Sequence, residues 1–350
     1  MIDEIEKSIL VKLLKNSNIS ERIGVLFTST TNPSFEFNLI RDYALIMRVV
    51  IDIYIRTNNN DFFIKIINYI ENEYVIQNMK TLIYLQKPKI NVLNYSRRIN
   101  RRQYDCLALR GINFIKIYNL LSDEYKILSE EVLEMIKKDL IFILDSIDYP
   151  SFDIWDKHYG WHFYTRIVEL KFLKDCFNFQ SKFGLDIRNE YNKLLLNFKN
   201  HLQKDRIISS FDKNGNIIKL DDSSIFLGLS HIDYDNEIIN LIDLKIFLNN
   251  SNSLLNKFKK KKIKMIGRFK NDKYFDKQIC TLVLVQYYYK LSKICNNRYL
   301  ESACRDILCQ ILSFEDIYNS DQINNLELSS KKISLNYSEL FVTFSRLNNN

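Results

Sequence analysis

The chain has 350 residues, of which 46% are hydrophobic, and a formal net charge of +8. With only seven glycines and three prolines, it lacks the turn-rich composition of an all-β sandwich, and long helices are expected instead. No stretch approaches 18 uninterrupted apolar residues, and the N-terminus lacks the pattern of a secretory signal. We therefore expect a cytoplasmic protein that does not enter a membrane.

Apolar residues recur at helical spacing through most of the chain, which predicts about twelve helices. The pattern is clearest over 129–147, where a potential capping serine and two glutamates precede an apolar stripe. No linker rich in Pro, Gly or Ser interrupts the series, so a single domain over 1–350 is predicted. The predicted helices cover 3–16, 41–57, 61–86, 104–121, 129–147, 160–180, 187–203, 222–230, 236–249, 277–294, 299–313 and 337–347.

Six cysteines are scattered without CxxC pairs, which indicates buried free thiols rather than a zinc site. The excess positive charge is concentrated in RRINRR (97–102) and KFKKKKIK (257–264). Neither run accompanies a recognisable RNA- or DNA-binding module, so we interpret both as solvated surface and expect no nucleic-acid partner. The alternative, contact with RNA, would give binding that weakens steeply with salt.

The stretch FDIWDKHYGWHFYTRIVEL (152–170) concentrates residues that are rare in this chain. It holds both tryptophans, two of the four histidines and one of the seven glycines. Asp153 and Asp156 bracket Trp155, so a general acid could lie beside an aromatic platform. The alternative is that one of these aspartates only caps the helix predicted from 160.

Several stretches together, in order, resemble the glucoamylases, glycoside hydrolases of family 15. The spacing D-I-W-D-x-x-x-G-x-x-F-Y-T within 153–165 is similar to the family's acid motif. The resemblance runs from about residue 6 to 347 and implies an all-α (α/α)6 barrel with the active pocket at one end. The other matching stretches are TTNPSFEFNLIRDYALI (30–46), YDCLALRGINFI (104–115), DDSSIFLGLSHID (221–233), IGRFKNDKYF (266–275) and LNYSELFVTFSRL (335–347).

The resemblance also implies roles for single residues. The catalytic acid of the family falls on Asp156, and its Arg-Asp pair, which grips the terminal glucose, falls on Arg41 and Asp42. His158 and His162 match no ligand of the family, and we expect structural roles for both. The residues expected to bind substrate are Arg41, Asp42, Asp153, Trp155, Arg268 and Asp272.

The general base is assigned by counting. An inverting glycosidase needs a second carboxylate, about 6.5–9.5 Å from the acid, to activate water on the opposite face of the sugar. In the family, the base precedes an acidic residue of the final helix at a fixed distance, and this acidic residue falls on Glu339. The same distance without gaps places the base at Asn325, and a loop two residues shorter places it at Glu327. An asparagine cannot take a proton from water. The predicted catalytic pair is therefore Asp156 and Glu327, with a base lost at Asn325 as the alternative.

The sequence departs from the family pattern at the acid and at the sugar platform. Asp156 is one methylene shorter than glutamate, and Lys157 replaces an acidic residue and favours the ionised form of its neighbour. Two tryptophans of the pattern are replaced by aliphatic residues, Leu39 and one near Ile99.

Two functions are compatible with these features. The resemblance implies a monomeric hydrolase with a weakened site that releases glucose from α-1,4-glucan or maltooligosaccharide ends by inversion, without metal or cofactor. The alternative is an inactive glucoamylase fold that binds glucan or acts as a regulatory module.

Overall fold

The computed structural model describes residues 37–78, 89–91, 102–121, 123–155, 157–232, 244–258, 266, 277–312 and 343. The chain divides into two compact units. The α2–α8 unit comprises Leu14–Trp161 and Thr165–Phe198, and the α9–α13 unit comprises Met1–Leu13, His162–Tyr164 and Lys199–Asn350. The single domain over 1–350 stays a prediction, and each unit is described by itself.

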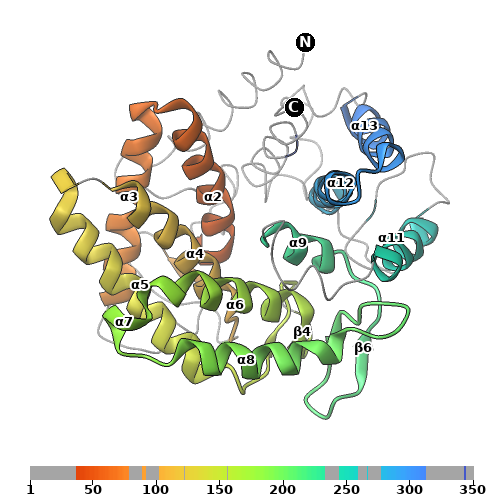
Figure 1. The fold of residues 1–350 in the computed structure, drawn as a ribbon, viewed down its shortest axis with the longest axis horizontal. Helices are drawn as coiled ribbons and strands as arrows, with labels where there is room; N and C mark the ends of the chain where they lie inside the picture. The colour runs from red at the N-terminus through yellow and green to blue at the C-terminus, as the bar shows by residue number, and fades with distance from the viewer. Residues whose placement is uncertain are drawn as a thin grey trace. The chain divides into compact units, whose positions relative to one another are not determined.

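The α2–α8 unit is built around helix α4, which packs against α2 and α5, while α3 packs against α2 (Figure 1). Both α2 and α4 are buried around nearly their whole circumference, because apolar residues occupy all their faces. The elements are β1 (Phe37–Leu39), α2 (Ile40–Thr57), α3 (Asn60–Asn78), β2 (Lys89–Asn91), α4 (Asp105–Leu120), η3 (Asp123–Tyr125), α5 (Lys126–Ser146), β3 (Ser151–Phe152), β4 (Tyr159–His162), α6 (Phe163–Asp175), η4 (Cys176–Phe179), α7 (Gln180–Phe183) and α8 (Ile187–Phe198). The last residue of β4 and the first two of α6, His162–Tyr164, are assigned to the α9–α13 unit.

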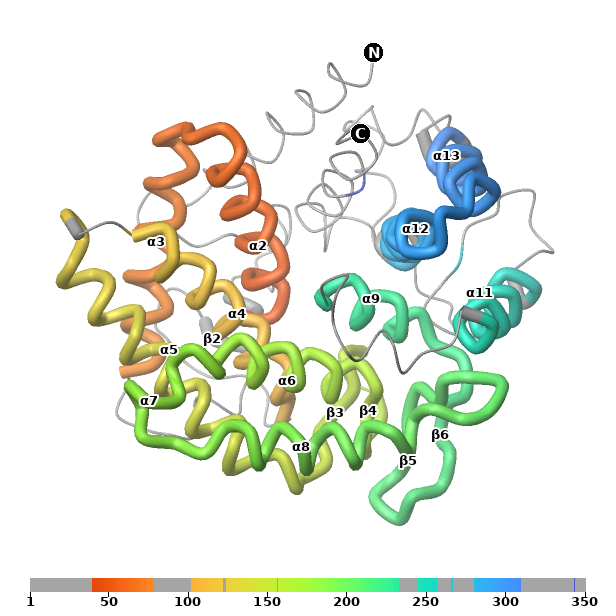
Figure 2. The backbone as a smooth tube through the Cα atoms, viewed as in Figure 1, coloured from red at the N-terminus to blue at the C-terminus, as the bar shows by residue number. Residues whose placement is uncertain are grey.

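The α9–α13 unit contains helix α12, which packs against both α9 and α13 (Figure 2). A short antiparallel pair, β5 and β6, precedes these helices, with Ser210 opposite Lys219. The elements are η5 (Lys199–His201), β5 (Ser210–Phe211), β6 (Ile217–Lys219), α9 (Ser224–Ser230), α11 (Leu244–Phe258), α12 (Lys277–Ile294) and α13 (Arg298–Leu312).

Most of the predicted helices that fall on described residues are confirmed. Those predicted over 41–57, 104–121 and 277–294 agree with α2, α4 and α12 to within one residue at each end. The helix predicted from 160 is wrong at its start, because Tyr159–His162 form strand β4, which pairs antiparallel with β3. Aromatic residues at this point favour a strand. The helices predicted over 3–16 and 337–347 lie outside the described residues, apart from Thr343.

Helix α11 differs from its prediction as well. A helix was predicted over 236–249, whereas α11 runs from Leu244 to Phe258, and residues 236–243 lie outside the described part of the chain. The run NNSNS after Leu248 consists of poor helix formers, which is why the periodicity ended there.

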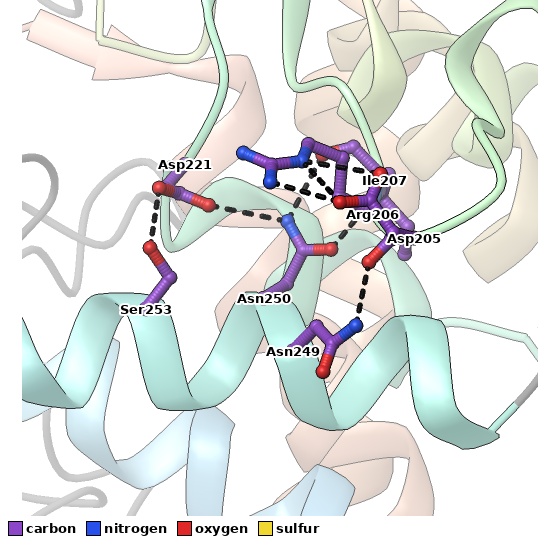
Figure 3. Close-up of polar contacts among 7 residues, drawn as sticks. All are labelled: Asp205, Arg206, Ile207, Asp221, Asn249, Asn250 and Ser253. Carbon is purple, nitrogen blue, oxygen red and sulfur yellow. Dashed lines mark hydrogen bonds and ion pairs between the residues drawn. The ribbon is translucent and has the colours of Figure 1, made fainter.

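Tertiary hydrogen bonds hold the polar part of α11 in place (Figure 3). The buried side chain of Asn250 accepts a hydrogen bond from the Ile207 amide at 2.7 Å and donates to the Ile207 carbonyl at 2.9 Å. Ser253 donates to Asp221 at 2.7 Å. These contacts outweigh the low helix propensity of the segment, which the sequence pattern alone does not reveal.

Two further features of the structure are the state of the cysteines and the hydropathy of the helices. All six cysteines are free thiols, and four of them are buried. Cys295 and Cys309 are exposed, in contrast to the prediction, because Cys295 follows the end of α12 and Cys309 lies on the solvent side of α13. No helix in the described ranges has both the length and the hydropathy that a membrane span requires.

Candidate active site at the start of α2

Two charged residues are buried in the first turn of α2. Arg41 is 8% exposed and Asp42 is 5% exposed, immediately after β1, which pairs with β2. The Arg41 guanidinium binds both carboxylate oxygens of Asp105, the first residue of α4, at 2.5 and 3.3 Å. A buried charge is expensive unless it is paired, so this ion pair fixes the start of α2 against the start of α4.

Arg41 also links α2 to the stretch that holds the tryptophans. Its Nη1 donates to the backbone carbonyl of Ile154 at 2.8 Å, a contact that spans 113 positions in the chain. Trp155, the next residue, is half-buried. The structure therefore brings together four of the predicted site residues, Arg41 with its neighbour Asp42, and Asp153 with Trp155.

The carboxylate of Asp42 has an unsatisfied oxygen. Within the described ranges, Oδ2 of Asp42 is buried and accepts no hydrogen bond. A buried acceptor without a donor costs about 1–3 kcal/mol, and a ligand or a water molecule that donates to this oxygen would remove that cost. A sugar hydroxyl is a suitable donor for this oxygen.

Asp153 closes the loop that follows β3. Its Oδ1 accepts hydrogen bonds from the backbone amides of Lys157 at 2.6 Å and His158 at 3.2 Å, and its own amide donates to the His158 carbonyl at 2.9 Å. The carboxylate thus stabilises a loop that leads into β4, and it does not cap a helix. A contact between Asp153 and substrate stays a prediction.

A second buried ion pair lies in the same unit, on α6. Arg166 donates to Glu169 at 2.8 Å, and the Arg166 guanidinium lies 4.6 Å from the ring centre of Trp161, a cation–π contact. Burial raises the pKa of Glu169, Arg166 acts in the opposite direction, and the charge of Asp105 adds to the rise. The influence of Asp105 links this pair electrostatically to the pair formed by Arg41 and Asp105.

Glu169 gives a pH-dependence with a defined sign. Because its pKa is raised in the folded chain, the folded state binds the proton more tightly than the unfolded state. Its contribution to stability is complete below the ordinary carboxyl pKa of about 4.3 and is lost as the pH rises through the raised value. We expect the unfolding free energy of the parent, relative to that of Glu169→Gln, to fall as the pH rises above the ordinary carboxyl pKa of about 4.3. Urea unfolding at a series of pH values checks this, and a constant or rising difference would contradict it.

The remaining site predictions fall on parts of the chain outside the described residues. The predicted acid, the predicted base with its alternative, and two of the substrate-binding residues are among them. They are Asp156, Glu327, Asn325, Arg268 and Asp272.

Residues missed by the sequence analysis also contribute to the site. Asp105 lies inside the matching stretch 104–115, but an acidic residue at a helix start already has a local explanation in the helix dipole. Its partnership with Arg41, 64 positions away, becomes visible only in the fold.

His162, for which a structural role is expected, has a buried side-chain partner. In the α9–α13 unit, Nδ1 of His162 lies 2.9 Å from the hydroxyl of Ser210, and both side chains are buried. This contact agrees with a structural role for His162.

Comparison with known sequences identifies relatives. The profile described as Glycosyl hydrolases family 15 matches residues 17–346. The probable glucoamylase of Schizosaccharomyces pombe is 27% identical over 165 residues, which cover 45% of this chain and 37% of that protein. The intracellular sporulation-specific glucoamylase of Saccharomyces cerevisiae is 26% identical over 175 residues, which cover 44% of this chain and 31% of that protein. The chain thus spans well under half the length of these relatives.

Comparison with solved structures shows the fold. The glucoamylase of Hormoconis resinae matches with a TM-score of 0.78 and 16% identity, over 99% of this chain and 73% of that chain. The glucoamylase of Saccharomycopsis fibuligera matches with a TM-score of 0.69 and 19% identity, over 98% and 86%. A glycosidase variant in complex with glucose matches with a TM-score of 0.64 and 9% identity, over 99% and 96%. The predicted all-α (α/α)6 fold class is therefore confirmed.

Proposed function

The chain belongs to the family 15 glycosyl hydrolases, and from this premise we propose that it hydrolyses α-1,4-glucan or maltooligosaccharide from the non-reducing end and releases glucose with inversion. The observation that supports the proposal most directly is the start of α2. There Asp42 has a buried, unsatisfied carboxylate oxygen next to Arg41, which contacts the backbone beside Trp155. A sugar has both polar hydroxyls and an apolar ring face, so its binding needs a polar acceptor such as Asp42 together with an aromatic surface such as Trp155.

The sugar would be held by complementary contacts. Asp42 would accept a hydrogen bond from a hydroxyl of the terminal glucose, and a hydrogen bond to a charged group contributes about 1.5–3 kcal/mol. The half-buried indole of Trp155 would offer a flat apolar surface to the pyranose ring. Arg268 and Asp272 would add polar contacts, as the resemblance to the family implies.

The chemical step would use two carboxyl groups on opposite faces of the scissile bond. Asp156 would protonate the glycosidic oxygen, and Glu327 would take a proton from the attacking water. Asp156 is shorter than the family's glutamate, and a displacement of about 1 Å costs on the order of 10²-fold in rate. We therefore propose a hydrolase with weakened turnover.

The test is glucose release from maltose, maltotriose and glycogen by the purified chain. We expect turnover that Asp156→Ala lowers by about 10²–10⁴-fold, the range for loss of a general acid. Asp148→Ala is the matched control, because Asp148 is an exposed aspartate that pairs with Lys193 on the surface. Turnover that is absent, or present and insensitive to Asp156→Ala, would reject the proposal.

The second candidate is a catalytically inactive member of the family that binds glucan or regulates a partner. The specific observation in its favour is the combination of Asp156 with Lys157, where the family pattern has two acidic residues. Calorimetric binding of maltooligosaccharides without glucose release would favour this candidate. A gain in glucose release by Asp156→Glu would instead show that only the acid has changed. The monomeric state, the cytoplasmic location and the absence of a cofactor or a nucleic-acid partner remain predictions.

A further inference from the structure

Three successive residues before Trp155 each have a backbone group bound by a distant part of the chain, and the first two bonds come from the segment preceding α4. The amide of Phe152 donates to the Arg102 carbonyl at 2.9 Å. The side-chain amide of Gln103, itself buried, donates to the Asp153 carbonyl at 3.0 Å. This segment therefore holds the end of β3 and the first residue of the loop.

The third bond comes from Arg41, and Asp105 determines where Arg41 lies. Arg41 donates to the Ile154 carbonyl at 2.8 Å, and its other contacts include both carboxylate oxygens of Asp105. Asp105 is fully buried, and its side chain shows no exposed surface. The bidentate geometry orients the guanidinium plane, and with it the Nη1 that reaches the loop.

We infer that Asp105 is a positioning residue for the loop that carries Trp155, and that it acts through Arg41. Without the charge of Asp105, the guanidinium of Arg41 would be buried with its pairing weakened, and the adjacent carboxylate of Asp42 would compete for it. Arg41 would then leave the Ile154 carbonyl, and the loop would lose its third bond.

This arrangement has two consequences. The ion pair fixes the backbone on which Trp155 is carried, and it occupies the charge of Arg41 so that Asp42 keeps an oxygen for a ligand. The expected effect on turnover rests on the proposed function. The effect on the loop does not, because it follows from the hydrogen bonds alone.

The chain offers a direct optical test, since Trp155 and Trp161 are its only tryptophans. In a Trp161→Phe background, all tryptophan emission comes from Trp155. We expect Asp105→Asn to shift this emission to longer wavelength and to increase its quenching by acrylamide, because an amide can accept from only one of the two Arg41 nitrogens. Asp52→Asn is the matched control, because Asp52 pairs with Lys116 at 2.8 Å and also links α2 to α4, at a half-exposed position. Its emission should equal that of the background.

A second variant keeps the inference testable if Asp105→Asn fails to fold, which circular dichroism would show. Arg41→Lys keeps the positive charge beside Asp105 but lacks the planar fork that binds both Asp105 oxygens and the Ile154 carbonyl, and should change Trp155 emission and quenching in the same direction. Unchanged emission and quenching in the folded variants would overturn the inference.

Activity provides a separate measurement. If the parent releases glucose from maltose, Asp105→Asn should lower kcat by about 10²-fold and also raise KM, because the loop that carries Trp155 would shift and Asp42 would lose its free oxygen to Arg41. A parent without turnover would reject the proposed function, and the fluorescence of Trp155 would still decide the role of Asp105. An unchanged kcat in a folded, active Asp105→Asn variant would overturn the inference.

Discussion

Replacement of Arg110 by methionine should lower the unfolding free energy by about 3–5 kcal/mol, the usual effect of removing one partner from a buried ion cluster. Arg110 has no exposed side-chain surface, and neither have its two partners. It binds Asp139 at 2.6 and 3.0 Å and Glu73 at 2.7 Å. Removal of the cation would leave two buried carboxylates in the core of the α2–α8 unit without the guanidinium that pairs with both of them.

The electrostatics of the cluster support this expectation. Burial alone would lower the pKa of Arg110, but the charges of Asp139 and Glu73 outweigh it and raise that pKa. Burial raises the pKa of Asp139 even though Arg110 acts against the rise. The carboxylate of Asp139 therefore depends on Arg110 to stay ionised, and it would take up a proton or destabilise the fold if Arg110 were lost.

Chemical denaturation measures the effect, and two comparisons sharpen it. Arg305→Met removes an exposed arginine that pairs with Glu301 on α13, and should change stability by no more than about 1 kcal/mol. Addition of Glu73→Gln and Asp139→Asn to Arg110→Met should recover much of the loss, because neutral groups need no counter-charge. A loss below about 1 kcal/mol in Arg110→Met alone would contradict the prediction.

The second large effect is expected from Gly111→Ala in α4. A Cβ at this position would lie 2.3 Å from Cε2 of Phe172 and 2.5 Å from its Cζ. The ring of Phe172 is fully buried on α6, so it has no space to withdraw into. Alanine gains about 1 kcal/mol of helix propensity over glycine, but a contact this short costs more, and we expect a net loss of about 1–3 kcal/mol.

A double-mutant cycle tests the cause. Phe172→Leu shortens the opposing side chain, so the pair Gly111→Ala and Phe172→Leu should be more stable than the sum of the single effects predicts. Additive losses would show that Phe172 is not the obstacle.

The helices that the sequence predicts well are those with an intrinsic signal. The apolar residues of α5 repeat at the helical period, those of α12 form a long apolar segment, and neither helix contains a glycine or a proline. The errors at β4 and α11 have a different origin. The short strand β4 depends on pairing with residues that lie outside its own segment, such as those of β3, and the polar half of α11 is held by Asp221 and by the backbone of Ile207.

The candidate site could be predicted only in part, for a similar reason. Arg41 and Trp155 were found because they match motifs that occur in a fixed order, and no local periodicity brings them together. Asp105 and Arg110 were not singled out, because a charged residue in a helix is usually solvent-exposed. Their importance follows from burial and from partners that lie 64 and 37 positions away in the chain.

The residues that hold the loop closed, among them Asp153, are different from the residue predicted to act as the acid. The main chain on either side of the aspartate at 156 is bound by Asp153, by Gln103 and by Arg41, and none of these bonds involves that aspartate. During evolution its side chain could lengthen, shorten or disappear while the surrounding path of the polypeptide was preserved. A substitution at position 156 is therefore expected to change the chemical group available there while every one of these backbone hydrogen bonds is kept.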